Sequence, residues 1–175
     1  MDKELVLAIE KLKEVRRKGW VDSGIQDAES VADHTCSVAL CVLFAALERK
    51  DIDLKKALTM ALIHDLAESV VGDITPYDGI AKKDKLAKEE KALKNLLVSI
   101  PKDKQKELLN LWKEMLAGTS PEAKLVLEAD TFDRVVQANI YRNKGHDVDR
   151  FFHVVNDLKG TDFERVLLLV LGSKT

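Results

Sequence analysis

The chain has 175 residues, of which 46% are hydrophobic and 33% are charged, and its formal net charge at pH 7 is -2. This length suits one domain with a substantial core, and the near-neutral charge gives no general argument for binding nucleic acid. The two cysteines, Cys36 and Cys41, form no CxxC motif, which argues against a disulfide framework and favours a reducing compartment. Because the first twenty residues lack the apolar core of a signal peptide and no apolar run approaches a membrane span, we predict a cytoplasmic protein without a membrane partner.

Long amphipathic runs predict an all-α fold, since strand-type alternation is scarce and only three prolines and eight glycines interrupt them. We expect helices at residues 3–17, from 27 or 30 to about 50, 51–72, 82–99, about 103–117, 120–145, 147–158 and 161–171. In the helix at 51–72, Asp53 is the expected N-cap and Gly72 the expected C-cap. The helix at 120–145 begins with Ser120 as N-cap and Pro121 at the first helical position.

The lysine-rich stretch "AKKDKLAKEEK" at residues 81–91 could be read as a patch for phosphate or nucleic acid. We interpret it as the solvated face of a helix, because its charges pair at spacings of four residues. Cys36 and Cys41 fall in an apolar helix, where we expect them to be small core residues.

The stretch "ALIHDLAESVVGD", residues 61–73, places ionisable residues inside an apolar run. On one helix His64, Asp65 and Glu68 would share a surface patch, because residues three and four apart are neighbours. A buried carboxylate beside a buried imidazole is costly unless the two are paired or bind a cation. A purely structural hydrogen bond between His64 and Asp65 is the alternative.

Two other apolar helices carry similar groups. His34 lies in line with an apolar stripe that should face the core, and a single histidine there would ordinarily be a hydrogen-bonded core residue. Asp130 lies beside a second such stripe, of which Asp133 is a member. Asp133 could be an outer partner of a site or a charge on the helix surface.

Three apolar helices therefore offer two imidazoles and two carboxylates to one interior. These four side chains form a borderline-hard ligand set that suits Zn, Mn, Co, Fe or Ni. Facing helices of a bundle are a natural place to assemble such a site. The four residues are His34, His64, Asp65 and Asp130.

The order of these four residues resembles the H…HD…D signature of the HD-domain metal-dependent phosphohydrolases. Four segments resemble the 5′-deoxynucleotidase branch of that family: "GW" at 19–20, "ESVADH" at 29–34, "HDLAESVVGDI" at 64–74 and "SPEAKLVLEAD" at 120–130. The resemblance extends from about residue 5 to residue 145. It implies an HD-domain helical bundle, which we expect to occupy residues 1–175 as a single domain.

Carried over by position, the resemblance implies that the four residues bind one divalent metal ion: Co, Mn, Zn, Fe, Ni or Mg. It also implies that Glu68 is the catalytic carboxylate and that Asp73 is a further catalytic acid. For Asp73, a turn residue at the helix end is the alternative. The late histidines His146 and His153 lie outside these motifs, and surface or packing roles are expected for them.

Trp20 matches an aromatic residue that lines the sugar pocket in the family and helps to select deoxyribose. A core anchor for the first helix is the alternative. In the bacterial enzymes the tryptophan directly follows a substrate-binding arginine, whereas here Gly19 precedes Trp20. Arg17 is the nearest candidate for that substrate contact, with Arg16 and Lys18 as alternatives.

The predicted activity is metal-dependent release of phosphate from a deoxyribonucleoside 5′-monophosphate. The first alternative is an HD phosphohydrolase that acts on another nucleotide or small phosphate ester. The second is a non-catalytic helical module that keeps a metal, although a structural site would not require acid–base groups beside its ligands. Apolar faces on the lysine-rich helix and on "LLNLWKEML" at 108–116, together with the resemblance, predict a homodimer.

Overall fold

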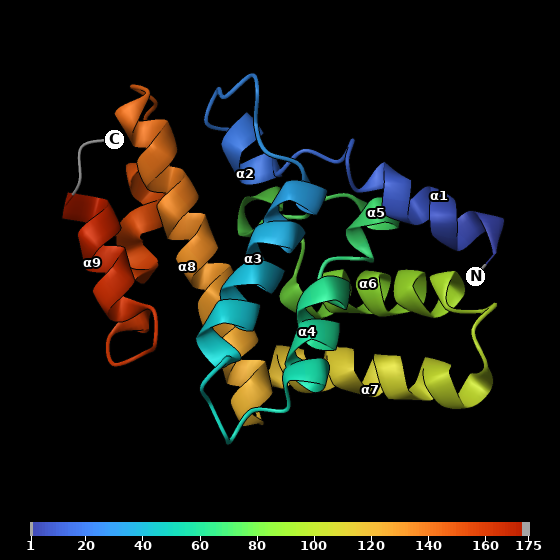
Figure 1. Cartoon of the computed structure of the whole chain (residues 1–175). Coiled ribbons are helices and arrows are strands. Elements are labelled where there is room, and N and C mark those ends of the chain that lie inside the picture. Colours follow the sequence, from blue (N-terminus) through green and yellow to red (C-terminus); the bar gives the residue numbers. More distant parts are fainter. Residues whose placement is uncertain (1, 173–175) are drawn as a thin grey trace.

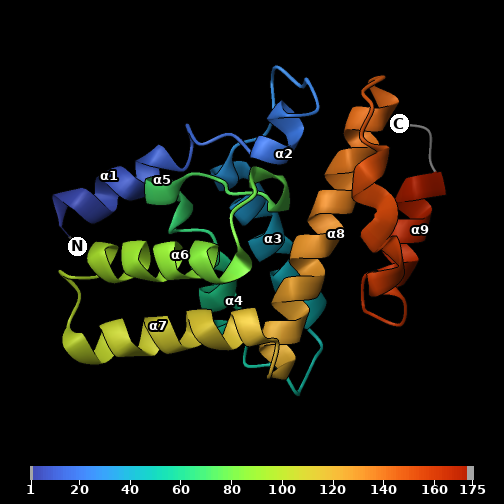
Figure 2. The ribbon, with the colours of Figure 1, turned by 180° about the vertical axis from the view of Figure 1, so that it is seen from behind.

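In the computed structural model, which describes residues 2–172, the 23-residue helix α8 (Pro121–Asn143) lies between two groups of helices (Figures 1 and 2). The other helical elements are α1 (Lys3–Lys11), α2 (Lys18–Val21), α3 (Val31–Ala46), α4 (Leu54–Ile63), α5 (Glu68–Val71), η1 (Pro76–Asp78), α6 (Lys82–Leu96), α7 (Lys102–Ala117), η2 (Asp149–Leu158) and α9 (Glu164–Gly172). Helices α3, α4 and α7 pack on one side of α8, and η2 and α9 pack on the other. Helices α6 and α7 contact each other, and α1 lies against α5 and α6.

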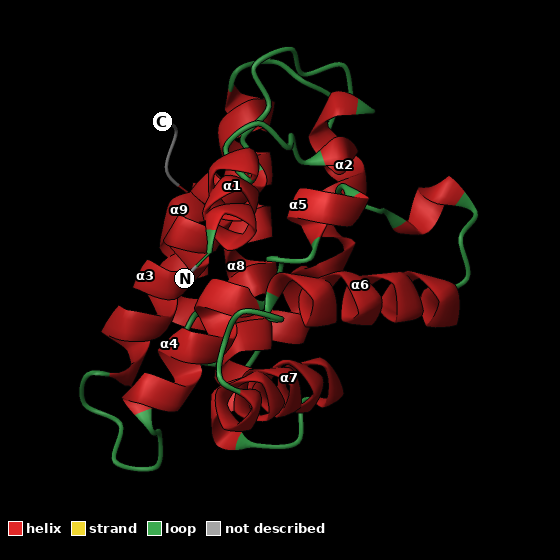
Figure 3. Ribbon diagram, turned by 90° about the vertical axis from the view of Figure 1, so that its right-hand side faces the viewer, coloured by secondary structure: helices red, strands yellow, loops and turns green. Residues whose placement is uncertain are grey.

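This arrangement confirms the predicted all-α fold. Figure 3 shows helices joined by loops, and residues 2–172 contain no strand beyond one isolated bridge, between Arg16 and Ser30. In the same part of the chain, no helix combines the length and the apolar character needed to cross a bilayer. The core consists mainly of aliphatic side chains from α3, α4, α6 and α8, with Trp112 of α7 buried among them.

Helix starts agree with the predicted caps. Ser30 accepts a hydrogen bond from the backbone N–H of Asp33, whose carboxylate accepts one from Ser30 in return, so a capping box begins α3. Asp53 caps α4 and Ser120 caps α8, as predicted. The polar ends of three core helices are thus satisfied locally.

The helix expected at 51–72 is broken after Ile63, so that prediction was wrong in its continuity. From His64 to Ala67 the chain forms a tight turn, in which hydrogen bonds run over three residues instead of four. The backbone carbonyl of His64 accepts a hydrogen bond from Trp112 Nε1 at 3.2 Å. In a continuous helix neighbouring side chains point about 100° apart, and the turn instead lets His64 and Asp65 face the same point.

The first predicted helix, 3–17, also proved too long, because α1 ends at Lys11. Beyond a turn, the chain becomes extended at Val15 and Arg16 and pairs with the segment that precedes α3. The backbone N–H of Arg17 donates to the carbonyl of Glu29 at 3.0 Å. This long-range pairing, which local sequence does not encode, directs the Arg17 side chain inward.

Three smaller predictions need correction. The segment at 149–158 is a 3-10 helix, η2, instead of an α-helix. Cys36 is exposed and lines an apolar groove, although Cys41 is half-buried against the core as expected. The lysine-rich stretch, predicted to be a solvated helix face, is solvated only in part. Lys85 is half-buried and donates to the carbonyl of Ile74 at 2.6 Å, and Glu89, one turn further on, is buried.

Glu122 joins the start of α8 to the start of α4, and its loss should destabilise the fold. It accepts hydrogen bonds from the backbone N–H of Asp53 at 3.0 Å and from Lys56 Nζ at 3.1 Å. Burial favours the neutral acid, but these hydrogen bonds outweigh it and lower the pKa of Glu122 to about 2. We expect Glu122→Ala to lower the free energy of unfolding at pH 7 by about 1.5–3 kcal/mol.

A group with a lowered folded-state pKa stabilises above its unfolded pKa and loses that contribution as the pH falls. The effect of Glu122→Ala should therefore shrink between about pH 4.3 and pH 2. Urea unfolding of the metal-free protein at pH 7 and pH 3 measures this. The exposed Glu107, replaced by alanine, is the control and should change stability by less than about 0.5 kcal/mol. An equal effect of Glu122→Ala at both pH values would refute the assignment.

Candidate metal centre and adjoining cavity

Four side chains from three separate parts of the chain converge at the turn after α4. The Nε2 atoms of His34 and His64 lie 3.3 Å apart. Asp130 Oδ1 lies 3.2 Å from His34 Nε2, and Asp65 Oδ2 lies 3.0 Å from His64 Nε2. Ligands held about 2.0–2.2 Å from a metal ion lie roughly 3–3.6 Å apart. The atoms of His34, His64 and Asp130 lie close enough together to share one cation. Asp65 lies at the edge of this group, with its Oδ2 3.8 Å from His34 Nε2.

The other ring nitrogen of each histidine, Nδ1, has a hydrogen-bond partner within the protein. His34 Nδ1 lies 2.7 Å from Asp133 Oδ2, and His64 Nδ1 lies 2.7 Å from the carbonyl oxygen of Ala61. A carbonyl oxygen can only accept, so Nδ1 of His64 carries the proton and the neutral ring turns the lone pair of Nε2 toward the cluster. Partners of this kind orient metal-binding histidines in proteins. The donor set therefore fits a divalent metal ion.

The charge of each side chain in the cluster depends on the charges of its neighbours. Burial and Arg17 disfavour a charged His34, but hydrogen bonds to Asp130 and Asp133 outweigh them and raise its pKa to about 9. Burial also works against the charged forms of Asp65 and Asp130, yet the nearby imidazoles hold the pKa of each carboxyl well below its usual range. Both carboxylates are thus ionised near neutral pH and available to a cation.

Asp133, left open between two roles by its sequence position, lies behind His34 as a hydrogen-bond partner. We expect Asp133→Ala to weaken metal binding by about 10–100-fold, because His34 would lose the partner that fixes its ring. Isothermal titration of the metal-free protein with Mn²⁺ or Co²⁺ measures this. Asp33→Ala is the control, because Asp33 is an acidic residue in the first turn of α3 that lies outside the cluster. An unchanged affinity in Asp133→Ala would contradict the role.

A cavity of about 440 Å³ opens beside the cluster. Its wall includes all the remaining predicted site residues: Arg17, Trp20, Glu68 and Asp73. Glu68 is 4% exposed, and its Oε2 is a buried oxygen without a hydrogen-bond partner among the described residues. Burial and the nearby charges of Asp65 and Asp73 raise the pKa of Glu68 well above its ordinary value. Such a carboxyl group is prepared to take up a proton.

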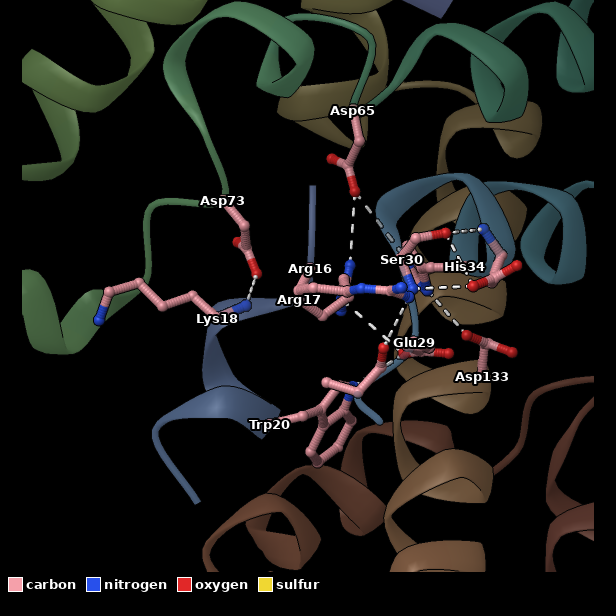
Figure 4. Close-up of polar contacts among 12 residues, drawn as sticks. Arg16, Arg17, Lys18, Trp20, Glu29, Ser30, His34, Asp65, Asp73 and Asp133 are labelled. Carbon is pink, nitrogen blue, oxygen red and sulfur yellow. Dashed lines mark hydrogen bonds and ion pairs between the residues drawn. The ribbon is translucent and has the colours of Figure 1, made fainter. Parts of the chain in front are cut away.

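Figure 4 shows Arg17 lying between the carboxylates of Asp65 and Glu29. Its Nη1 lies 3.4 Å from Asp65 Oδ2. The two alternatives point elsewhere: Arg16 Nη1 donates to the carbonyl of Ala28 at 3.0 Å, and Lys18 Nζ pairs with acidic side chains near the surface. Of the three basic residues, only Arg17 lines the cavity in the described part of the chain.

Trp20 and Asp73 each combine a structural contact with a place in the cavity wall. Trp20 is 2% exposed, donates Nε1 to Glu29 at 2.8 Å, and packs 4.2 Å from the ring of Phe151. Asp73 accepts the backbone N–H of Lys18 at 2.7 Å, at the start of α2 (Figure 4). Both the anchoring and the pocket interpretations of Trp20 therefore agree with its position.

Sequence reasoning missed several cavity residues. Lys85 of α6, Arg134 of α8, and Tyr77, Arg150 and His153 from η1 and η2 also line the wall. A second cavity of about 580 Å³ shares Asp65, Asp130 and Lys85 with the wall of the first one. The spacing of Arg134, four residues after Asp130 on one helix, was the available signal for that residue. No such signal marks the residues of η1 and η2 in the sequence, because tertiary packing brings these segments to the cavity.

The chain was compared with known proteins. The profile of the HD domain family matches residues 9–167. The human protein 5′-deoxynucleotidase HDDC2 is 39% identical over 135 residues, which cover 77% of this chain and 65% of the human protein. The 5′-deoxynucleotidase YGK1 of Saccharomyces cerevisiae is 34% identical over 164 residues, which cover 90% of this chain and 75% of the yeast protein. The chain spans slightly less than two thirds of the human, bovine and mouse relatives that it matches.

Solved structures show the same architecture. A conserved hypothetical protein from Pyrococcus furiosus superposes with a TM-score of 0.80 at 33% identity, covering 97% of this chain and 96% of that one. A predicted metal-dependent phosphohydrolase from Magnetospirillum magnetotacticum superposes with a TM-score of 0.73 over 94% of this chain and 87% of that one, at 22% identity. At that identity the second similarity concerns the fold alone.

Proposed function

The chain belongs to the HD-domain family, and from this premise we propose that it is a metal-dependent phosphomonoesterase that converts deoxyribonucleoside 5′-monophosphates to deoxynucleosides and phosphate. One observation carries the proposal. Four side chains of the kinds that bind metal ions converge at the edge of a cavity. The wall of this cavity holds a buried carboxyl oxygen without a hydrogen-bond partner among the described residues and several basic side chains. The names of the human and yeast relatives support the deoxynucleotide as substrate.

The metal ligands in this proposal are His34, His64, Asp65 and Asp130, holding one ion of Co, Mn, Zn, Fe, Ni or Mg. Mixed imidazole and carboxylate donors favour the transition metals of that set over Mg. When bound, such an ion lowers the pKa of water and offsets the negative charge of the phosphate. The outer contacts of His34 and His64 support the ring orientation that ligation needs.

Glu68 is the general base of the proposed reaction, and Asp73 assists it. Glu68 lies in the cavity wall, and its raised pKa gives its ionised form a strong affinity for the proton of an attacking water. The departing 5′ oxygen of the nucleoside requires a proton, which Glu68 or Asp73 can return to it. Glu68 and Asp73 are the two carboxyl groups of the proposed site that are not proposed to bind the metal ion.

Arg17 and Trp20 are the proposed substrate contacts. A guanidinium binds phosphate oxygens through paired N–H groups, and Arg17 lies 3.4 Å from the ligand carboxylate Asp65, at the phosphate end of the cavity. Trp20 is a rigid aromatic wall that would lie against the deoxyribose, where a further hydroxyl group on ribose would be crowded. These positions support the assignment of both residues.

Screening a panel of deoxyribo- and ribonucleoside 5′-monophosphates with several divalent cations tests the proposal. We expect phosphate release from the deoxy series, with slower release from the ribo series. Release only from cyclic nucleotides, triphosphates or other esters would favour the first alternative. No release from any ester with Mn²⁺ or Co²⁺ would favour the non-catalytic metal-binding module.

A single domain over residues 1–175, a cytoplasmic location and a homodimer complete the proposal. The apolar residues of α6 and α7 that motivated the dimer are partly used within the chain, since Leu93, Trp112 and Met115 are buried. An apolar groove lined by residues of α1, α3 and α4 offers another surface for a second copy. Light scattering at micromolar concentration should give the mass of a dimer, and the mass of a monomer would contradict it.

A further inference from the structure

Arg134 of α8 has an unusual set of contacts for a partly buried arginine. Its Nε is buried and has no hydrogen-bond partner among the described residues. Its Nη2 makes one long hydrogen bond, 3.3 Å to Thr131 Oγ1, and the described residues provide no ion pair for it. A buried donor without a partner is costly, and protein structures contain few of them.

The location of this unsatisfied group is informative. Only three side-chain atoms are buried and unpartnered in the described part of the chain, and two of them, Arg134 Nε and Glu68 Oε2, belong to residues that line the same cavity. Glu68 is the proposed general base. A second unsatisfied group in this wall indicates that a ligand, and not the protein, provides its partner.

Helix geometry directs Arg134 toward the metal cluster. Asp130 precedes it by four residues, so the two side chains are neighbours on one face of α8. Side chains on a helix lean toward its N-terminus, which places the Arg134 guanidinium over the turn that carries Asp130. The positive charge of Arg134 also helps to lower the pKa of Asp130. The group bound beside Asp130 in the proposed reaction is the phosphate.

Building on the proposed function, we propose that Arg134 binds the phosphate of the substrate and of the product, in the cavity that Arg17 also lines. Its guanidinium lines the cavity and carries N–H groups that can donate to two phosphate oxygens, and a bound anion would offer the partner that Nε lacks in the protein alone. Arg17 is held by Asp65 and Glu29. Arg134 is therefore the less committed of the two guanidinium groups and the one with more to gain from the anion.

Inorganic phosphate is the probe for this proposal, because it reports binding without turnover. The full-length protein is loaded with Mn²⁺, and its melting temperature is followed as phosphate is added. We expect Arg134→Met to weaken the apparent phosphate affinity by about tenfold or more, as for a lost charge-assisted hydrogen bond. Arg134→Lys, which keeps the charge but not the guanidinium, should lose less. Without phosphate, the melting temperature of Arg134→Met should equal or exceed that of the wild type, because an unsatisfied group is gone.

Arg142, two turns further along α8, is the matched control. It donates to Asn139 Oδ1 at 2.7 Å, lies over the ring of Phe152 and does not line the cavity. Arg142→Met should lower the melting temperature and leave the phosphate affinity unchanged. Unchanged phosphate affinity in Arg134→Met, an equal loss in Arg142→Met, or no phosphate binding by the wild type would each overturn the role of Arg134. A wild type that binds phosphate but hydrolyses no nucleotide would overturn the proposed function alone.

Discussion

Replacing Glu68 by glutamine is expected to lower kcat for phosphate release by about 10²–10⁴-fold, the usual contribution of a positioned general base. Glutamine has almost the same shape but cannot take up a proton at neutral pH. Because Glu68 is not one of the four proposed metal ligands, Mn²⁺ should still bind with nearly wild-type affinity. The KM of the residual activity should change little, since the predicted defect lies in proton transfer.

The same substitution has an expected signature in stability. Burial and two nearby carboxylates raise the pKa of Glu68 in the folded protein, so its ionisation opposes folding above the unfolded pKa of about 4.3. This cost grows as the pH rises toward the folded-state value, and glutamine avoids it. We therefore expect metal-free Glu68→Gln to be more stable than the wild type at pH 7, with a smaller difference at pH 4.

Glu128→Gln is the matched control for Glu68→Gln. Glu128 lies on α8, and burial raises its pKa too, but it lies outside the cavity wall. Steady-state kinetics on both variants separate a chemical role from the general effect of neutralising an acid that is at least partly buried. Wild-type kcat in Glu68→Gln, or an equal loss in Glu128→Gln, would rule out Glu68 as the base.

Replacing His64 by alanine is expected to weaken metal binding by more than about 100-fold, beyond the effect of losing an outer partner. His64 Nε2 lies 3.3 Å from the corresponding atom of His34 and 3.0 Å from Asp65 Oδ2. Without this imidazole the site keeps one nitrogen donor and two carboxylates, a poorer set for a transition metal. Phosphate release should disappear at micromolar metal and return only in part at millimolar metal.

Calorimetric titration with Co²⁺ measures the metal affinity of His64→Ala directly. His146→Ala is the control, because His146 is a histidine that packs against Tyr141, outside both the cluster and the cavity. The His146→Ala variant should bind one ion per chain, with the affinity of the wild type. Wild-type affinity in His64→Ala would remove this residue from the ligand set.

Much of the candidate site could be predicted from the sequence because its residues lie on strongly periodic helices. His34 lies in an apolar stripe of α3 and Asp130 lies beside one of α8, and the structure brings the two residues together. The two histidines had no visible link in sequence, but a bundle gives inward-facing residues few other places to meet. The resemblance then selected Glu68 and Asp73 from many acidic residues, and the structure places both in the cavity wall.

The parts that could not be predicted depend on contacts between distant segments. The break after Ile63 needs Trp112 to satisfy a backbone carbonyl freed by the turn. The inward direction of Arg17 needs the pairing of its segment with the residues before α3. Local helix preference favours a continuous helix in both places, and tertiary hydrogen bonding overrides it. Arg134 had a readable spacing from Asp130, but its missing hydrogen-bond partner is a property of the folded structure alone.

Phosphate release by the metal-stripped protein, before and after addition of one equivalent of Co²⁺ or Mn²⁺ per chain, tests the central claim most directly. The substrate is a deoxyribonucleoside 5′-monophosphate, and excess chelator is removed before the assay. We expect no release from the stripped protein and recovery that reaches its maximum near one equivalent. Undiminished release without metal, or none at any metal concentration, would contradict a hydrolase built on the cluster of His34, His64, Asp65 and Asp130.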